Sequence, residues 1–175
     1  MDYKKFQGIF YPTLIIIIAV IIRLLPHPPN FVPIGAMALF GGAYLDKKYA
    51  FIIPLLAMFI SDLFLGLHST MIFVYASFIL IGIMGIWLKT HLNIKSLIGA
   101  SLTSSVLFFI ITNFGVWFMF DFYTKNLAGL LDSYIAAIPF FRNTLISDLV
   151  YIGLFFGSFE LVKRYLFVRK NLPQN

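Results

Sequence analysis

Six apolar segments account for most of this chain, and their lengths constrain its fold more than any other feature of the sequence. Hydrophobic residues make up 61% of the chain and charged residues only 11%, whereas soluble domains are about half apolar and about one quarter charged. An apolar run of about 20 residues is what a helix needs to cross a bilayer. We therefore predict an all-α polytopic membrane protein, a six-transmembrane-helix bundle forming one integral membrane domain over residues 1–175, with helices at approximately 11–25, 31–45, 50–67, 69–88, 97–120 and 142–167.

Basic residues are distributed unevenly between the loops on the two sides of this predicted bundle. If successive helices cross in opposite directions, ten basic residues fall on one side, whereas Arg23, Lys125 and Arg142 fall on the other. Because cytoplasmic loops carry an excess of Lys and Arg, we predict a multi-pass protein of the bacterial inner (cytoplasmic) membrane with both termini in the cytoplasm. The net charge of +6 then reflects topology, and nucleic acid is not an expected partner. The ten residues are Lys4, Lys5, Lys47, Lys48, Lys89, Lys95, Lys163, Arg164, Arg169 and Lys170.

The connection at 121–141 is too apolar to be an ordinary solvated loop. It contains Tyr123, Tyr134 and the run Pro139, Phe140 and Phe141. Long connections in compact domains are often functional lids, and apolar ones lie in the membrane interface. We predict an external cap here, formed by a short interfacial helix or a re-entrant segment.

The tetrapeptide ISDL occurs twice, at 60–63 and at 146–149, and each copy places an aspartate inside an apolar run. A charged side chain at membrane depth costs a few kcal/mol or more, so such residues face a partner, a cavity or a pathway. Asp62 and Asp148 are therefore the first candidates for a functional site. At ~1.5 Å of rise per residue, Asp62, Asp148 and Asn113 lie ~7–10 Å below the external surface. We predict a ligand-binding pocket at this depth, lined by Asp62, Asp148, Arg23, Asn113, Asn30, Tyr75 and Trp117.

Each of these residues also has a structural interpretation. The two aspartates can form ion pairs with Arg23 and Arg142 that fix the bundle, and we assign Arg142 only this role. Asn113 can hydrogen-bond a neighbouring helix, and the two aromatic residues can be packing or interfacial side chains. No metal site is predicted. His27 and His68 both fall in predicted external loops and are considered for ligand or metal contact, His68 above all, but loop histidines are usually just solvated.

Small residues form two further patterns. Gly, Ala and neighbouring residues run through 35–43, and Gly153 and Gly157 lie four positions apart. This spacing allows close approach of helix backbones in lipid. Either the small residues pack inside the bundle, or they dock another membrane subunit.

Catalytic motifs are absent from the sequence. The chain has no cysteine, no phosphate-binding P-loop motif and no HExxH motif. Ser61 and Ser147 precede the two aspartates, but neither has a histidine or lysine at helical spacing to act as a base. We predict that the protein is not an enzyme and needs no cofactor.

Four stretches resemble the substrate-binding (S) components of energy-coupling factor (ECF) type importers, in particular small uncharacterised bacterial membrane proteins. They are RLLPHPPNFVPIGAMALFGGA at 23–43, SDLFLG at 61–66, NFGVW at 113–117 and IPFFRN at 138–143. The resemblance implies a six-helix bundle that captures a vitamin or related micronutrient in an externally open pocket. It also implies a transmembrane coupling protein and two cytoplasmic ATPases as partners. The alanine-x-x-x-alanine docking pattern of that family is missing from the first helix, where Ala19 stands among bulky residues.

We therefore expect a vitamin or micronutrient importer subunit whose partners are a small-molecule substrate and the lipid bilayer. One alternative is a membrane scaffold or morphogenesis subunit without transport activity, in which the aspartates only lock the bundle. Another is a solitary carrier, either proton-coupled or carrying cobalamin with His68 as an axial ligand. The sequence does not identify the ligand.

Overall fold

A computed structural model describes the backbone of residues 3–170 and the side chains of residues 10–47 and 49–165. Within this part of the chain there are six α-helices and no β-strand, which confirms the predicted all-α class and the order of the helices. The helices are α1 (Tyr3–Leu24), α2 (Ile34–Tyr44), α3 (Lys47–Leu65), α4 (Met71–Leu88), α5 (Ile94–Met119) and α6 (Leu127–Lys170).

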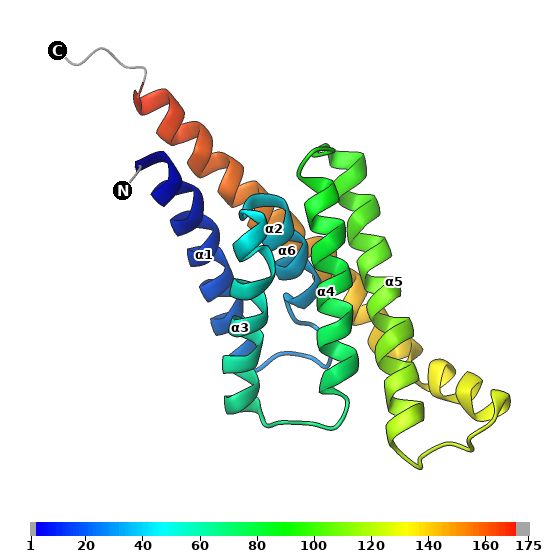
Figure 1. The fold of residues 1–175 in the computed structure, drawn as a ribbon. Helices are drawn as coiled ribbons and strands as arrows, with labels where there is room; N and C mark the ends of the chain where they lie inside the picture. Colours follow the sequence, from blue (N-terminus) through cyan, green and yellow to red (C-terminus); the bar gives the residue numbers. More distant parts are fainter. Residues whose placement is uncertain (1–2, 171–175) are drawn as a thin grey trace.

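The connections between helices alternate between the two ends of the bundle (Figure 1). The α1–α2, α3–α4 and α5–α6 connections lie at one end, which we call the loop end. The first residues of α1 and the last residues of α6 lie toward the opposite end, with the α2–α3 and α4–α5 connections. This up-and-down arrangement agrees with the assumption that successive helices run in opposite directions. The structure itself contains no membrane.

Helix α2 is the central helix of the bundle. It packs against each of the other five helices, and its residues 35–43 are all buried. A helix that is apolar on every side is stable only when it is surrounded by other elements. Pro33 precedes its first residue, and the chain is extended at Leu45, so the helix has only 11 residues. The core of the protein is built around this short helix.

Glycines allow α2 to approach α4 closely. A Cβ atom added to Gly42 would lie 2.3 Å from the carbonyl oxygen of Gly82, and one added to Gly85 would lie 2.5 Å from that of Leu39. These contacts show that the small residues of 35–43 pack inside the bundle, as in the first of the two interpretations. Gly153 and Gly157 differ, because a Cβ atom at either position would meet nothing within 4 Å.

Three helices, not the six predicted, are long and apolar enough to cross a membrane. They are Met71–Leu88, Ile94–Met119 and Leu127–Tyr165. Phe10–Leu24, Ile34–Tyr44 and Tyr49–Leu65 are apolar but shorter. For α2 the physical reason is clear, because 11 residues rise only ~16 Å, about half the thickness of a hydrocarbon core.

The segment 121–141 differs from the predicted cap. Only 120–126 connects α5 to α6; from Leu127 the chain is helical and continues without a break through Pro139 into the predicted last helix. The Oδ1 atom of Asn126 accepts a hydrogen bond from the backbone N–H of Gly129 at 2.9 Å and so caps the first turn. The predicted start of the last helix at 142 is therefore wrong, and most of the expected cap is the first part of α6 (Figure 1).

Large apolar side chains are exposed on the outside of the bundle. On α3, for example, Ile52, Leu56, Phe59 and Leu63 are each 46–57% exposed and recur every three or four residues. Contiguous exposed apolar surface of this kind marks contact with a membrane or another protein. The predicted orientation of the termini stays a prediction. Five of its basic residues have side chains outside the described part of the chain, namely Lys4, Lys5, Lys48, Arg169 and Lys170.

Candidate ligand-binding site

The first predicted aspartate, Asp62 on α3, is held in a buried ion pair. Its Oδ1 atom lies 2.5 Å from Nη2 of Arg23, and the two side chains are 1% and 10% exposed. The hydroxyl of Tyr75 on α4 donates a hydrogen bond to Oδ2 at 2.7 Å. Arg23 also donates to the hydroxyl of Ser61, which in turn donates to the carbonyl of Met58 at 2.8 Å. We call Arg23, Ser61, Asp62 and Tyr75 the paired cluster, since its charges compensate each other.

The second aspartate, Asp148 on α6, has different partners. It is 2% exposed, and its Oδ2 atom accepts a hydrogen bond from the hydroxyl of Ser105 on α5 at 2.5 Å. The backbone N–H groups of Gly35 and Ala36 also donate to its carboxylate. These amides belong to the first turn of α2, where unpaired N–H groups and the helix dipole favour an anion. No residue of the described part of the chain forms an ion pair with Asp148.

The absence of a side chain at Gly35 makes this arrangement possible. A Cβ atom added there would lie 2.6 Å from Oδ1 of Asp148. The carboxylate therefore occupies the space directly above the first turn of α2. Glycine here allows a close approach between an acidic side chain and a helix backbone.

A cavity lies beside Asp148 at the loop end of the bundle. The larger part, which we call the main chamber, has a volume of about 490 Å³ and lies between the α1–α2 connection, α4, α5 and the first part of α6. A smaller space of about 60 Å³, the side chamber, contains Asp148 and shares Asn30 and Phe108 with the main chamber. The main chamber is lined by Pro29, Asn30, Val74, Phe108, Thr112, Asn113, Val116, Tyr123, Ser133, Ala136, Ala137 and Phe140. The side chamber is lined by Asn30, Val32, Ile34, Gly35, Phe108, Thr144 and Asp148.

Hydrogen bonds to α6 fix the connection that carries Asn30. The side-chain amide of Asn143 donates to the carbonyl of Pro29 at 2.9 Å. The Ser147 hydroxyl lies 3.5 Å from the carbonyl of Asn30 and 3.4 Å from that of Val32. Asn30 itself has a φ of 59°, in the left-handed region that asparagine tolerates better than most residues. The wall shared by the two chambers is thus positioned by the residues that flank Asp148.

The polar side chains of α5 and α6 at the main chamber are anchored to their own helices. Asn113 donates its amide to the carbonyl of Phe109 at 2.8 Å, and the Thr112 hydroxyl donates to that of Phe108 at 2.7 Å. The Ser133 hydroxyl donates to the carbonyl of Leu130 at 2.7 Å. These bonds leave the Oδ1 atom of Asn113 and the hydroxyl lone pairs as acceptors. The chamber therefore offers both acceptors and donors, since the Asn113 amide keeps one free N–H and the Asn30 and Tyr123 side chains also line it.

The structure divides the residues predicted for one pocket into separate groups. Asn30, Asn113 and Asp148 line the two chambers. Arg23, Asp62 and Tyr75 line neither chamber and belong to the paired cluster instead. The contacts of Asp62 are therefore those of the structural interpretation, an ion pair with Arg23.

Trp117 and Arg142 lie outside the chambers as well. The Trp117 indole N–H donates to the carbonyl of Thr124 at 2.9 Å and so holds the α5–α6 connection. Arg142 is exposed and makes no ion pair among the described residues, so the ion pair predicted for it is not formed there.

The prediction missed Phe108 and Thr112 of α5, which line the chambers, and Ser105, which hydrogen-bonds Asp148. Together with Val116 they follow a spacing of three or four residues along one face of that helix. This periodicity around Asn113 was the available signal. Phe108, Tyr123 and Phe140, rather than Tyr75 and Trp117, are the aromatic residues that line the main chamber.

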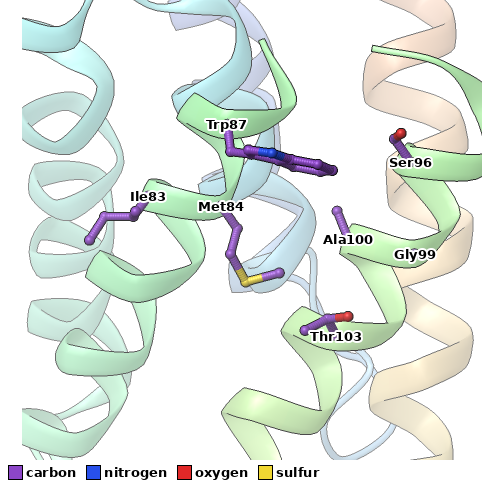
Figure 2. Close-up of a pocket in the computed structure, with 7 residues that line it drawn as sticks. All are labelled: Ile83, Met84, Trp87, Ser96, Gly99, Ala100 and Thr103. Atoms are coloured by element: carbon purple, nitrogen blue, oxygen red, sulfur yellow. The ribbon is translucent and has the colours of Figure 1, made fainter. Parts of the chain in front are cut away.

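A second groove lies between α4 and α5 near the opposite end. Figure 2 shows Trp87 and Met84 of α4 pointing toward the small residues of α5, with Ser96, Ala100 and Thr103 opposite them. Its volume is about 330 Å³, and none of its lining residues is charged. Unlike the side chamber, it has no charged lining residue with which to pair a charged ligand.

The two loop histidines considered in the sequence, His27 and His68, contact residues close to them in the chain. His68 lies within hydrogen-bond distance of the Thr70 hydroxyl, at 2.9 Å, and His27 lies 3.0 Å from the carbonyl of Pro28. The described residues contain no group of three or more His, Cys, Asp or Glu side chains placed to hold a metal ion. The loop histidines make local contacts.

No curated protein and no solved structure matches this chain. A family profile does match, over residues 4–172 and therefore over nearly the whole sequence. The chain belongs to DUF6580, a family of unknown function.

Proposed function

We propose that this protein is a membrane-embedded binding protein for a small molecule, the substrate-binding subunit of a vitamin or micronutrient importer. The observation that carries the proposal is the pair of adjoining chambers at the loop end, with a buried carboxylate at their inner wall. Ligand sites are typically clefts of ~300–1,000 Å³ with apolar walls and a few placed polar groups. The main chamber, at about 490 Å³, has this size and this composition.

The apolar exterior supports a location in the membrane. Exposed large aliphatic and aromatic residues cover the outer helix faces, and three helices have the length of a membrane span. In the bundle that we propose, the shorter apolar helices fill the rest of the membrane layer, and α2 is surrounded by protein rather than lipid. Backbone that is not helical at membrane depth is tolerated where it lines a cavity. The 25–33 connection, which carries Asn30, does so.

The direction in which the chambers face follows from the distribution of charge. The main chamber is lined by residues of the α1–α2 and α5–α6 connections, which lie at the loop end, opposite the start of α1 (Figure 1). If the ten basic residues of the other side are cytoplasmic, the chambers open to the outside of the cell. A binding protein for import needs this orientation.

The involvement of an energising module rests on the resemblance to S components alone. It implies that a transmembrane coupling protein and cytoplasmic ATPases act on the loaded bundle. The surface that would contact them is not the small-residue stretch of 35–43, because those residues are buried against α4.

The proposal is tested by thermal unfolding of the purified chain in detergent with a panel of vitamins. A ligand at 100 times its dissociation constant stabilises the folded state by ~2.7 kcal/mol, which corresponds to several degrees in Tm for a chain of this size. We expect at least one vitamin to produce such a shift. No shift by any of them, at millimolar concentration, contradicts the proposal.

A matched pair of variants locates the binding. Ala137 lines the main chamber, whereas Ala128, on the same helix, is exposed and lies outside it. Ala137→Trp fills a large part of the chamber and is expected to abolish the vitamin-induced shift. Ala128→Trp is expected to keep it. Equal binding by both variants also contradicts the proposal, because it places the ligand elsewhere.

A further inference from the structure

We propose that the side chamber receives a cationic head group, a protonated amine on a short linker, with Asp148 as its counter-ion. This inference rests on the function proposed above and assigns the chemical class of the ligand. The main chamber then holds an apolar or aromatic body. Three features support this assignment: the charge of the lining, the free acceptor positions of the carboxylate and the size of the side chamber.

The lining of the two chambers contains one carboxylate and no lysine, arginine or histidine. The nearby cations of the described chain are already engaged or exposed. Arg23 pairs with Asp62, and the ammonium group of Lys125 contacts the carbonyls of Trp117 and Phe120 in the α5–α6 connection. Arg142 is exposed. An anionic ligand would therefore find no positive partner and would meet the Asp148 carboxylate.

Asp148 has acceptor capacity that its present donors do not use. An ionised carboxylate offers about four lone-pair positions. Three donors reach it, namely the Ser105 hydroxyl and the N–H groups of Gly35 and Ala36. None of the three is a cation, so the negative charge of a buried group is stabilised by dipoles alone. A buried charge without a counter-ion favours the arrival of one.

The size of the side chamber limits what reaches the carboxylate. A cavity needs a volume of at least ~10–15 Å³ to hold one water molecule. The volume of the side chamber, about 60 Å³, is several times larger. This accommodates an ammonium group with its first methylene group but not a ring. The main chamber, which shares Asn30 and Phe108 with it, has room for the ring. The geometry thus selects a bulky apolar body joined by a short linker to a small cation.

Three indole compounds with the same ring test the charge of the head group. They are tryptamine, with an ammonium group; tryptophol, with a hydroxyl group; and indole-3-propionate, with a carboxylate. Binding to the purified full chain in detergent is measured by titration calorimetry at neutral pH. Charge-assisted hydrogen bonds are roughly twice as strong as neutral ones, and we expect tryptamine to bind about tenfold more tightly than tryptophol. Indole-3-propionate is expected to bind most weakly.

Three variants, one of them a control, connect this preference to the side chamber. Asp148→Asn removes the charge but keeps an acceptor for the α2 amides, so it is expected to reduce the advantage of tryptamine over tryptophol to about twofold or less. Asp121→Asn makes the same change at an exposed position in the α5–α6 connection and is expected to leave the advantage intact. Thr144→Leu narrows the side chamber while keeping the carboxylate. It provides the same test if Asp148→Asn does not fold.

The possible outcomes separate this inference from the proposed function. Equal binding of the three compounds, or tightest binding of indole-3-propionate, overturns the inference while leaving a small-molecule binder. An anionic vitamin as the strongest stabiliser in the thermal screen overturns it in the same way. If no indole and no vitamin binds, the proposed function falls and the inference falls with it.

Discussion

The two ISDL segments have the same sequence and the same local structure, yet their aspartates have different surroundings. In both, the serine hydroxyl donates to the carbonyl three residues earlier, that of Met58 for Ser61 and that of Thr144 for Ser147. In both, the aspartate is almost fully buried. Asp62 meets the guanidinium group of Arg23, whereas Asp148 meets a hydroxyl and the N-terminus of a helix. Local sequence determines burial and the serine bond, and tertiary packing determines the partner of the charge.

This difference separates two roles. The paired cluster joins α1, α3 and α4, and it lines none of the chambers described above. Asp148 joins α6 to α5 and α2 and lines the side chamber. A charge that is fully compensated needs no further partner, whereas a charge that retains free acceptor positions beside a cavity is available to a ligand.

The largest effect is expected from breaking the ion pair of the paired cluster. Arg23→Met leaves the Asp62 carboxylate buried without a counter-ion, and removing one partner of a buried pair typically costs ~3–5 kcal/mol. Unfolding of the purified protein by denaturant measures this loss. Replacing both residues, as Arg23→Met with Asp62→Leu, should recover most of the stability, because no charge then remains buried. A loss in the double variant as large as in the single one contradicts the role of the pair.

The next effect concerns the hydroxyl that contacts Asp148. Ser105→Ala removes a hydrogen bond to a charged group, and such bonds contribute ~1.5–3 kcal/mol. We expect a loss of this size in denaturant unfolding. Ser158→Ala serves as the control, since that hydroxyl donates only to the carbonyl of Phe155 on its own helix. Equal effects of the two variants would mean that the Ser105–Asp148 bond adds nothing to stability.

A smaller effect is expected from adding one methyl group between α2 and Asp148. Gly35→Ala places a Cβ atom 2.6 Å from Oδ1, so the carboxylate or the helix must shift. Overpacking of this kind costs ~1–3 kcal/mol. The same replacement at Gly153, where a Cβ atom meets nothing within 4 Å, should leave stability unchanged or slightly raised. Thermal unfolding of both variants makes the comparison. A Gly35→Ala protein as stable as the parent rules out the close approach.

The order of the helices was predictable because apolar runs and their breaks determine it. For α4 the prediction of 69–88 agrees closely with Met71–Leu88, since Thr70 and Lys89 end the apolar run. The length of α2 was overestimated, because Pro33 delays its start and the chain becomes extended at Leu45.

The start of α6 was not predictable from composition. The apolar composition of 121–141 suggested a cap, and Gly129 and Pro139 are residues that usually interrupt a helix, yet the helix forms, with Phe109 of α5 packed against Tyr134 and Phe141 along its length. The cap at Asn126 was the local signal for the start. Tertiary packing overrode the propensity of two residues that usually interrupt a helix.

The sequence predicted how deep the site residues lie along their helices but not the direction in which their side chains point. Counting the rise per residue indicates how far along a helix axis a side chain lies. It does not say toward which neighbour the side chain points. Val74 and Tyr75 show the consequence, because adjacent helical residues point ~100° apart. Val74 lines the main chamber, whereas Tyr75 contacts Asp62. The prediction therefore placed all seven residues in one pocket, although the fold distributes them over the chambers, the paired cluster and the α5–α6 connection.

The smallest effect on stability is expected for Asp148→Asn, and this variant best distinguishes the roles of the two aspartates. Asp148→Asn keeps an oxygen that accepts from the α2 amides, and it loses the attraction between a charge and the helix N-terminus, typically ~0.3–1 kcal/mol. The relief of burying a neutral group instead of an ion offsets part of that loss. We therefore expect the free energy of unfolding of Asp148→Asn to stay within ~1 kcal/mol of the parent. Asp62→Asn is expected to lose ~3–5 kcal/mol, since Arg23 then remains buried and unpaired. Denaturant unfolding of the two variants side by side decides the matter, because equal losses would show that both aspartates only hold the bundle together.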